Sequence, residues 1–231
     1  MDGLNKMNKK IAALTIGQSP RVDLAEDLAE LAQKGLDVVE VGALDGLSRE
    51  EIAAYAPSAG DYVLVSRLAD GTQVHLSKEK ISPLLQRRID ELSPSGVSAA
   101  LLMCSCDFDE LRMPQGFLIH PSRILFSAVS ALAAGKRLGV VMPTPEQVEP
   151  ARAKWSAVGG DVFVRSASPY VDPREAIASA AREIAAWGAD VCVLDCAGFS
   201  GWMKRLARET SGIPTVSALS VSMRLAAEIL A

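Results

Sequence analysis

Two of the four cysteines end segments that resemble one another. Residues 96–104 (Gly-Val-Ser-Ala-Ala-Leu-Leu-Met-Cys) and residues 188–196 (Gly-Ala-Asp-Val-Cys-Val-Leu-Asp-Cys) each run from a glycine, through a mostly apolar stretch, to a cysteine eight residues later. A cysteine thiolate can act as a base or nucleophile, and a thiol can donate a proton. The pattern predicts two related halves in which Cys104 and Cys196 carry the chemistry.

Each apolar stretch predicts a buried strand that ends at its cysteine. The stretches are too short for a free-standing helix and lack polar alternation, which is typical of a strand buried on both faces of a parallel sheet. Ligands of open α/β sheets bind at the carboxyl ends of the strands. We therefore expect Cys104 and Cys196 to face each other across a cleft at that edge.

Two thiols in this arrangement predict proton transfer at a carbon atom. A helix N-terminus beside a thiol stabilises its thiolate, so we expect both cysteines to exchange protons near neutral pH. A thiolate on one face of a carbon and a thiol on the other would invert that centre without a cofactor. The developing enolate charge would need fixed donors. The candidate substrate-binding donors are the hydroxyls of Ser19, Ser105 and Thr144 and the amides of Ala197 and Gly198.

Asp195 precedes Cys196 and is unusual at the end of a buried strand. A buried carboxylate must be paired or have a raised pKa, so Asp195 is expected to orient the thiol, to bind a substrate ammonium or to pair with an arginine. Cys192 and Cys106 are expected to be structural. A zinc site of four cysteines is an alternative, but the Cys-x-Cys and Cys-x3-Cys spacings differ from the usual two-residue spacing. We expect no metal and no cofactor.

Composition predicts a globular, cytoplasmic protein with reduced thiols. The chain has 231 residues, of which 49% are hydrophobic and 23% are charged, and its net charge is -4. No apolar run approaches the roughly 18 residues of a membrane span, and no block of Lys or Arg favours nucleic acid. The expected partner is a small anionic substrate. The oligomeric state is left open, with a homodimer as one alternative.

Strand and helix patterns alternate along the chain, which predicts an α/β fold. Ser19 and Thr144 each precede a proline and are predicted to be helix N-caps, with Gln147 completing a capping box. A second capping box is predicted at 48–51. The turn at 69–72 predicts a hairpin of strands 62–68 and 73–76 that adds to the main sheet. Further strands are expected at 11–17, 38–44, 138–142, 162–166 and 215–217, and a long helix at 78–92.

The two halves begin alike, with a strand followed by Ser19-Pro20 in one and by Thr144-Pro145 in the other. This likeness strengthens the interpretation as an internal duplication. The predicted domains are residues 1–118 together with 217–231, and residues 119–216. The last helix is expected to cross back onto the first half.

Several motifs spread over nearly the whole chain resemble the AroM family. They are Thr15-Ile-Gly17, Leu47-Ser-Arg-Glu-Glu51, Tyr55-Ala-Pro57, Pro121-Ser-Arg-Ile124 and Leu194-Asp-Cys-Ala-Gly-Phe199. That family is similar to the cofactor-independent aspartate/glutamate/hydantoin racemase superfamily. The resemblance implies two Rossmann-like, three-layer α/β/α domains with mainly parallel sheets, related by a pseudo-twofold axis.

The resemblance also implies an active site between the domains, with Cys104 and Cys196 as its two cysteines. Amino-acid racemases of the superfamily usually have Asn-Thr after the first cysteine and Thr after the second. This chain has Ser105-Cys106 and Ala197-Gly198 instead, which points away from aspartate or glutamate as the substrate.

Three functions are therefore considered. The leading hypothesis is a racemase or isomerase that acts at the α-carbon of a small carboxylate or hydantoin-like compound. The second is a binding or regulatory protein without turnover, and the third is a single-cysteine decarboxylase of the same superfamily.

Overall fold

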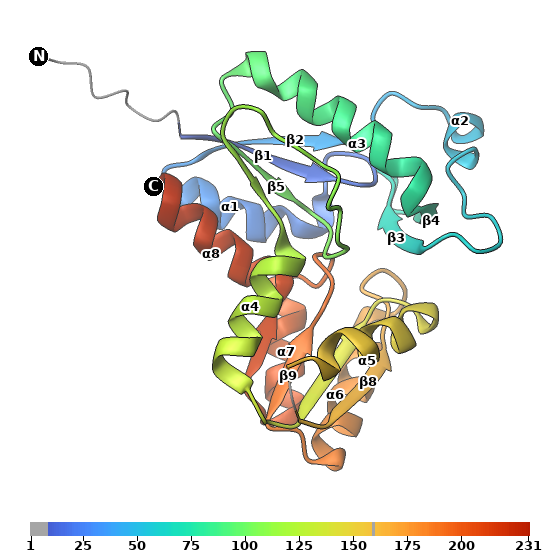
Figure 1. The fold of residues 1–231 in the computed structure, drawn as a ribbon, viewed down its shortest axis with the longest axis vertical. Helices are drawn as coiled ribbons and strands as arrows, with labels where there is room; N and C mark the ends of the chain where they lie inside the picture. The colour runs from blue at the N-terminus through green and yellow to red at the C-terminus, as the bar shows by residue number, and fades with distance from the viewer. Residues whose placement is uncertain (1–8, 159) are drawn as a thin grey trace, which may run out of the picture.

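The computed structural model describes residues 9–158 and 160–231, which form two α/β halves, one above the other in Figure 1. In this described part each half has a four-stranded sheet whose neighbouring strands are all parallel. The α/β fold class predicted from the sequence is confirmed. In these ranges no helix combines the length and the apolar character needed to cross a membrane.

The first sheet has the order β2-β1-β5-β6 and is covered on both faces. Its strands are β1 (Lys10–Thr15), β2 (Asp37–Gly42), β5 (Ala99–Leu102) and β6 (Phe117–Ile119). Successive side chains of a strand point to opposite faces. Accordingly, Ile11 packs in the core on the side of α1 (Ala25–Gln33), and Leu14 packs in the core on the side of α3 (Lys78–Leu92).

The second sheet repeats this order as β8-β7-β9-β10. Its strands are β7 (Leu138–Met142), β8 (Val162–Ser166), β9 (Val191–Leu194) and β10 (Thr215–Ser217). Its helices are α5 (Val148–Ser156), α6 (Pro173–Trp187) and α7 (Gly201–Ser211). The two cysteine strands, β5 and β9, occupy the same place in their sheets, which is what an internal duplication predicts.

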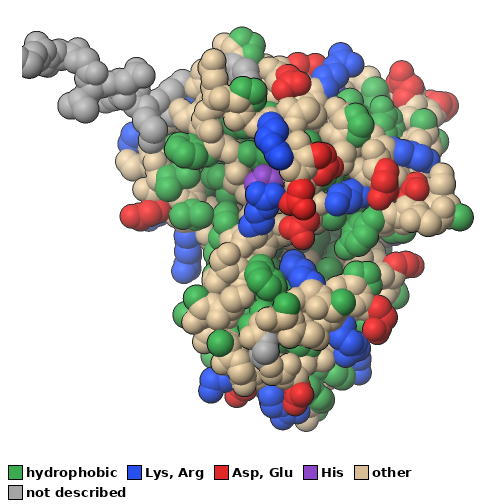
Figure 2. All heavy atoms as spheres, viewed as in Figure 1, with side chains coloured by type: hydrophobic (Ala, Val, Ile, Leu, Met, Phe, Trp, Pro, Cys, Tyr) green, Lys and Arg blue, Asp and Glu red, His purple; other side chains and the backbone are tan. Residues whose placement is uncertain are grey.

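The last helix of each half packs on the other half. α4 (Pro121–Ala133) follows β6 but buries Leu125 and Val129 in one core with Leu138 of β7. α8 (Ala218–Leu230) follows β10 but buries Leu219 in one core with Ile11 of β1. The two helices contact each other where the halves meet (Figure 1), and charged side chains gather along the same junction on the face shown in Figure 2. These contacts agree with the predicted return of the last helix, while the domain boundaries remain a prediction.

The hairpin is present, but its predicted addition to the main sheet is wrong. β3 (Val63–Arg67) and β4 (Gln73–Ser77) pair antiparallel as a separate two-stranded sheet. Leu64 and Leu76 are fully buried in the core that holds Leu14. Side-chain packing, rather than main-chain pairing with a neighbouring strand, therefore fixes the hairpin.

The helix start predicted at Ser19 is wrong, and the one predicted at Thr144 is right in position but lacks the predicted capping box. The Ser19 amide and hydroxyl both donate to the Asp45 carboxylate (2.7 and 2.5 Å), and a 3-10 turn, η1 (Val22–Leu24), precedes α1. Thr144 does precede a 3-10 turn, η3 (Pro145–Gln147), but its side chain caps nothing there. Gln147 bonds to the hairpin instead.

The predicted capping box is confirmed at α2 (Arg49–Ala53), where the Ser48 hydroxyl accepts from the Glu51 amide and the Glu51 carboxylate accepts from the Ser48 amide. A serine also lies at the start of α3, where the Lys80 amide donates to the Ser77 hydroxyl (3.3 Å).

Candidate functional site

Cys104 and Cys196 line the same cavity, at the carboxyl ends of β5 and β9. Each cysteine lies two residues beyond the last residue of its strand, which is Leu102 in β5 and Leu194 in β9. We call this space the cysteine cavity. Its other lining residues are Tyr62, Leu64, Val65, Ser105, Cys106, Met142, Pro143, Gln147 and Asp195. The two thiols thus share one space between the halves, as the duplicated pattern predicts.

The cysteine cavity is small, with a volume of about 30 Å³. That volume admits a water molecule or two but no organic substrate. Its cover comes from the hairpin, because Leu64 and Val65 of β3 line it together with the preceding Tyr62. Admission of a substrate would require the hairpin to move.

Two hydrogen bonds join the hairpin to the second half. The Gln147 amide donates to the Val63 carbonyl (3.0 Å), and the Ser168 hydroxyl donates to the Gln73 side-chain oxygen (2.9 Å). In Figure 1 the hairpin lies beside the junction, on the side of α5. These bonds hold the hairpin against the second half, beside the cysteine cavity.

Cys196 accepts a hydrogen bond from the backbone amide of Gly198 (3.3 Å) and is 9% exposed. Burial raises the pKa of its thiol to about 11, although the Gly198 amide and the nearby Arg21 guanidinium act in the opposite direction. A hydrogen bond to sulfur from a fixed amide favours the thiolate. Cys196 is thus a buried thiol with one built-in group that stabilises its charged form.

Cys104 is also a buried thiol. Burial raises its pKa well above the usual value and the neighbouring Cys106 thiol raises it further, although the backbone amide of Cys106 acts in the opposite direction. No helix of the described chain follows it before β6. The predicted lowering of both thiol pKa values by helix N-termini is therefore wrong. Even near Cys196, α7 begins only at Gly201, whose amide donates to Asp27 (2.8 Å).

Asp195 is buried at the edge of the cavity and is held by two donors. The Nζ atom of Lys154 and the Nε1 atom of Trp155 both donate to its Oδ2 atom, each at 2.9 Å. Its Oδ1 atom has no hydrogen-bond partner within the described residues. The predicted pairing partner was an arginine and the observed one is a lysine. The second carboxylate oxygen remains available to a ligand.

The other predicted binding residues are distributed unequally. Ser105 lines the cysteine cavity, whereas Ser19, Thr144, Ala197 and Gly198 do not. The Ser19 hydroxyl is used by Asp45, and the Gly198 amide is used by Cys196. Their assignment as substrate-binding groups stays a prediction, which would require a different arrangement of these loops.

The residues that sequence reasoning missed come mostly from the hairpin and from the loop after β7. Tyr62, Leu64 and Val65 looked like ordinary strand residues, and Gln147 was assigned to a helix cap. Cys106 shares its even spacing with Cys104, which could have placed it in the site. Cys192, predicted to be structural, is fully buried within β9.

The arginines that could attract an anion near the strand ends are paired with carboxylates. Arg21 is 3% exposed, bonds to Asp23 (2.7 Å) and donates to the Tyr170 hydroxyl (3.3 Å) across the junction. Arg123 and Arg165 form surface pairs with Asp109 and Glu183. Among residues 9–158 and 160–231, no three His, Cys, Asp or Glu side chains come together as a metal site would require.

Several solved structures share the fold of this two-half α/β protein. Arylmalonate decarboxylase, in a liganded double mutant, has a TM-score of 0.61 at 15% identity, with 96% of this chain and 92% of that chain covered. Glutamate racemase from Francisella tularensis subsp. tularensis gives 0.60 at 14% identity, with 96% and 81% covered. An aspartate racemase homologue from Pyrococcus horikoshii gives 0.61 at 12% identity, with 96% and 99% covered. The chain therefore shares its fold with these three proteins.

The sequence profile described as AroM protein matches residues 11–230. The chain therefore belongs to the AroM family, as its motifs suggested. No curated protein matches the sequence at a significant level.

Proposed function

We propose that this protein is a cofactor-independent racemase or isomerase in which Cys104 and Cys196 exchange protons at the α-carbon of a small carboxylate or hydantoin-like compound. The observation that carries the proposal is that two thiols, one from each half, line one cavity at the carboxyl ends of equivalent strands. The names of the structurally similar racemases support the same chemistry.

The reaction begins with a thiolate on one side of the substrate. That thiolate takes the α-proton, so the carbon–hydrogen bond breaks, a sulfur–hydrogen bond forms and the electron pair passes into an enolate. The opposite thiol then gives its proton to the other face of the same carbon and becomes the thiolate. No redox step is involved, and the two cysteines exchange their protonation states.

Cys196 is the better starting base of the two. The Gly198 amide and the positive charge of the Arg21 guanidinium both favour its thiolate, whereas burial and the neighbouring Cys106 thiol oppose ionisation of Cys104. At neutral pH a thiol with the Cys196 pKa of about 11 is almost entirely protonated, so the thiolate is a minor form. The substrate or the open state of the hairpin must supply further stabilisation before catalysis is efficient.

The free oxygen of Asp195 narrows the substrate class. Its Oδ1 atom is a buried acceptor with no partner in the described chain, and the residue lines the cavity. A buried acceptor gains most from a donor such as an ammonium or a ring N–H. We therefore favour an amino acid or a hydantoin-like compound over a plain carboxylate, and Ser105 is the cavity hydroxyl placed to assist.

The test is isotope exchange in heavy water. We would incubate the protein with a panel of amino acids, hydantoins and hydroxy acids, and follow loss of the α-proton signal by NMR together with optical rotation. Replacement of Cys104 or Cys196 by serine should each reduce racemisation by about 10²–10⁴-fold, because each removes one proton carrier. Cys192→Ala, which removes a buried thiol outside the cavity, should leave the rate within about threefold of the starting value, since it alters only packing.

Racemisation that survives in both serine variants would contradict the two-thiol mechanism. A rise in melting temperature with a panel compound, without exchange or any other turnover, would favour the binding protein instead.

A second candidate function, decarboxylation with one thiol, is favoured by the raised pKa values. Loss of carbon dioxide from a malonate-like substrate breaks a carbon–carbon bond and leaves the electron pair on the α-carbon as an enediolate. A protonated thiol then completes the reaction by donating to that carbon, and solvent later returns the proton to sulfur. Burial keeps both thiols protonated, which is the form this step requires.

The same variants separate the two functions. A decarboxylase would release carbon dioxide from disubstituted malonates and would retain most of its activity in one of Cys104→Ser and Cys196→Ser while losing it in the other. A racemase would lose activity in both and would release no carbon dioxide.

A further inference from the structure

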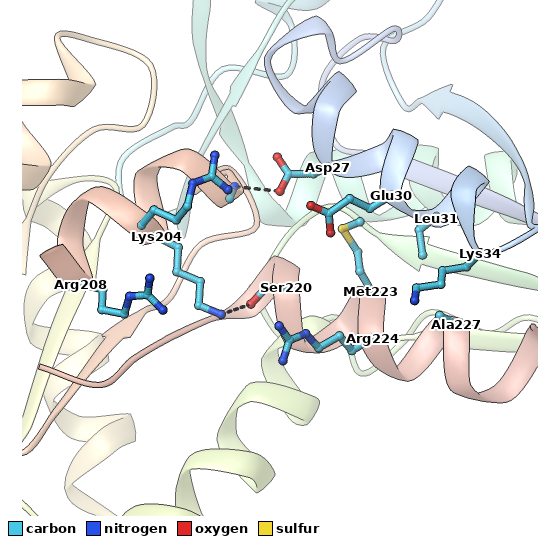
Figure 3. Close-up of a pocket in the computed structure, with 12 residues that line it drawn as sticks. Asp27, Glu30, Leu31, Lys34, Lys204, Arg208, Ser220, Met223, Arg224 and Ala227 are labelled. Carbon is cyan, nitrogen blue, oxygen red and sulfur yellow. Dashed lines mark hydrogen bonds between the residues drawn. The ribbon is translucent and has the colours of Figure 1, made fainter.

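A second cavity lies away from the cysteines, between helices of the two halves. It has a volume of about 270 Å³ and shares no lining residue with the cysteine cavity. Its walls come from α1, α7 and α8, so it lies where the last helix returns to the first half (Figure 3). We call it the basic pocket because of the side chains described next.

Positive charge dominates the basic pocket. Its lining includes two carboxylates, Asp27 and Glu30, and five cations, which leaves an excess of three positive charges in a chain whose net charge is -4. The five cations are Lys34, Lys204, Arg205, Arg208 and Arg224. None of them forms an ion pair with any residue in the described part of the chain.

Hydrogen bonds engage Asp27 and Lys204, whereas no hydrogen bond to another described residue engages the guanidinium groups of Arg208 and Arg224. The Asp27 carboxylate accepts from the Gly201 amide at the start of α7 (2.8 Å), and Lys204 donates to the Ser220 hydroxyl (2.9 Å). Arg208 and Arg224 come from two different helices and point into the same space around Lys204 (Figure 3). Burial lowers the pKa of Lys204, and the guanidinium groups of Arg224 and Arg208 lower it further, which agrees with a concentration of positive charge.

This concentration is costly without a counterion. Like charges that converge in a partly buried space repel one another, and an anion that binds them removes the repulsion. Arginine pairs with phosphate or carboxylate through two parallel hydrogen bonds, so two guanidinium groups facing one space favour an anion with several oxygens.

The far side of the pocket has a different character. Leu31, Met223 and Ala227 line it away from Arg208 (Figure 3). Leu31 and Met223 are buried side chains of the core that α1 and α8 share. A ligand that fills the pocket therefore meets Lys204, Arg208 and Arg224 at one end. At the other end it meets apolar side chains, with Glu30 and Lys34 beside them.

We propose that the basic pocket binds a small organic phosphate monoester, with its phosphate between Arg208, Arg224 and Lys204 and its organic part against Leu31 and Met223. This site is independent of the proposed function at the thiols. Its ligand would act as an effector or as a stabilising ligand, not as the compound that reacts.

The test is isothermal titration calorimetry of the full chain with inorganic phosphate and with phenyl phosphate at low salt. Both should bind, and phenyl phosphate should bind more tightly because its ring reaches the apolar side. Arg208→Gln and Arg224→Gln should each weaken binding by about tenfold or more, the effect of losing one charge-assisted hydrogen bond. Both arginines are exposed on helices, so glutamine should preserve the fold, which circular dichroism would check.

Arg87→Gln is the matched control. Arg87 is an exposed arginine on α3, which covers the opposite face of the first sheet from α1 and α8. The Arg87→Gln substitution removes the same charge from the chain and should leave the dissociation constants of both phosphates unchanged. The proposal is overturned if neither phosphate binds, if the Arg208→Gln/Arg224→Gln double variant binds as tightly as the parent, or if Arg87→Gln weakens binding equally. Equal affinity for the two probes would overturn the organic part of the assignment. None of these outcomes depends on racemase or decarboxylase activity.

Discussion

The two cysteine loops occupy equivalent positions in the two sheets, but their surroundings differ. Position for position, Met103 corresponds to Asp195, and Cys106 corresponds to Gly198. In both loops the backbone amide two residues after the cysteine favours its thiolate. The second loop adds a fixed carboxylate beside its thiol, whereas the first loop places an apolar side chain and another thiol there. Duplication thus accounts for where the sulfurs lie, and the residues next to them account for how readily each one ionises.

The largest effect on stability is expected when Asp195, which has no acidic counterpart in the first loop, is removed. Asp195→Ala would leave Trp155 Nε1 unsatisfied and Lys154 unpaired, so we expect a loss of about 2–3 kcal/mol in the free energy of unfolding. The loss in stability is moderate because the Lys154 side chain is 25% exposed and partly solvated. Urea denaturation followed by tryptophan fluorescence would measure it.

Two variants serve as controls for that loss. Asp195→Asn keeps an acceptor for Trp155 and should cost less. Met103→Leu, at the equivalent position, should cost about 1 kcal/mol or less because it conserves volume in the core. Equal losses in the free energy of unfolding for Met103→Leu and Asp195→Ala would contradict the difference between the two loops.

Gly198→Ala tests whether the second loop needs its close approach to Tyr170. An added Cβ would lie 2.9 Å from Tyr170 Cζ and closer still to its hydroxyl, which Arg21 already holds. We expect the Cys196 loop to shift, at a cost of about 1–3 kcal/mol, measured by urea denaturation. Cys106→Ala, at the matching position of the first loop, should cost less than about 1 kcal/mol because that side chain is only half-buried.

Alkaline pH should destabilise the protein through Cys196. Folding raises its pKa from 9.0 to about 11, so the unfolded chain releases this proton first as the pH rises. Stability is therefore fully present below pH 9 and falls between pH 9 and 11, by about 1 kcal/mol from this group between pH 8 and 10. Chemical denaturation at both pH values should show a smaller fall in Cys196→Ala than in the parent. Identical pH profiles would contradict the raised pKa.

The smallest effect is expected at the hairpin, a feature of the first half alone. Gln147→Ala removes the hydrogen bond to the Val63 carbonyl, worth about 1 kcal/mol, so local opening should become roughly fivefold more frequent. Hydrogen exchange of the amides of β3 and β4 would report this change. Gln33→Ala, at the exposed end of α1, is the control and should leave hairpin exchange unaltered.

Much of the fold was predictable because local patterns and packing agree. β7, β8 and β10 begin and end at the predicted residues, and α3 matches the predicted range of 78–92. The placement of Cys104 and Cys196 at one cavity followed from their equal position in two repeated strands. Asp195 was recognisable because a carboxylate at a buried strand end requires a partner.

The failures share one cause, which is contact between segments far apart in sequence. Ser19 bonds to Asp45 rather than capping a helix, and Gln147 bonds to Val63 rather than to its own turn. Neighbouring residues in the sequence contain no record of such contacts.

The exchange of α4 and α8 between the halves constrains how the chain can be assembled during synthesis. The core around Ile11 lacks Leu219 and Met223 until the final helix has left the ribosome, long after the first sheet could form. One apolar face of the first half therefore stays uncovered until α8 has been synthesised. Residues 9–119 produced alone would lack Leu219 and Met223 and would leave this apolar face uncovered.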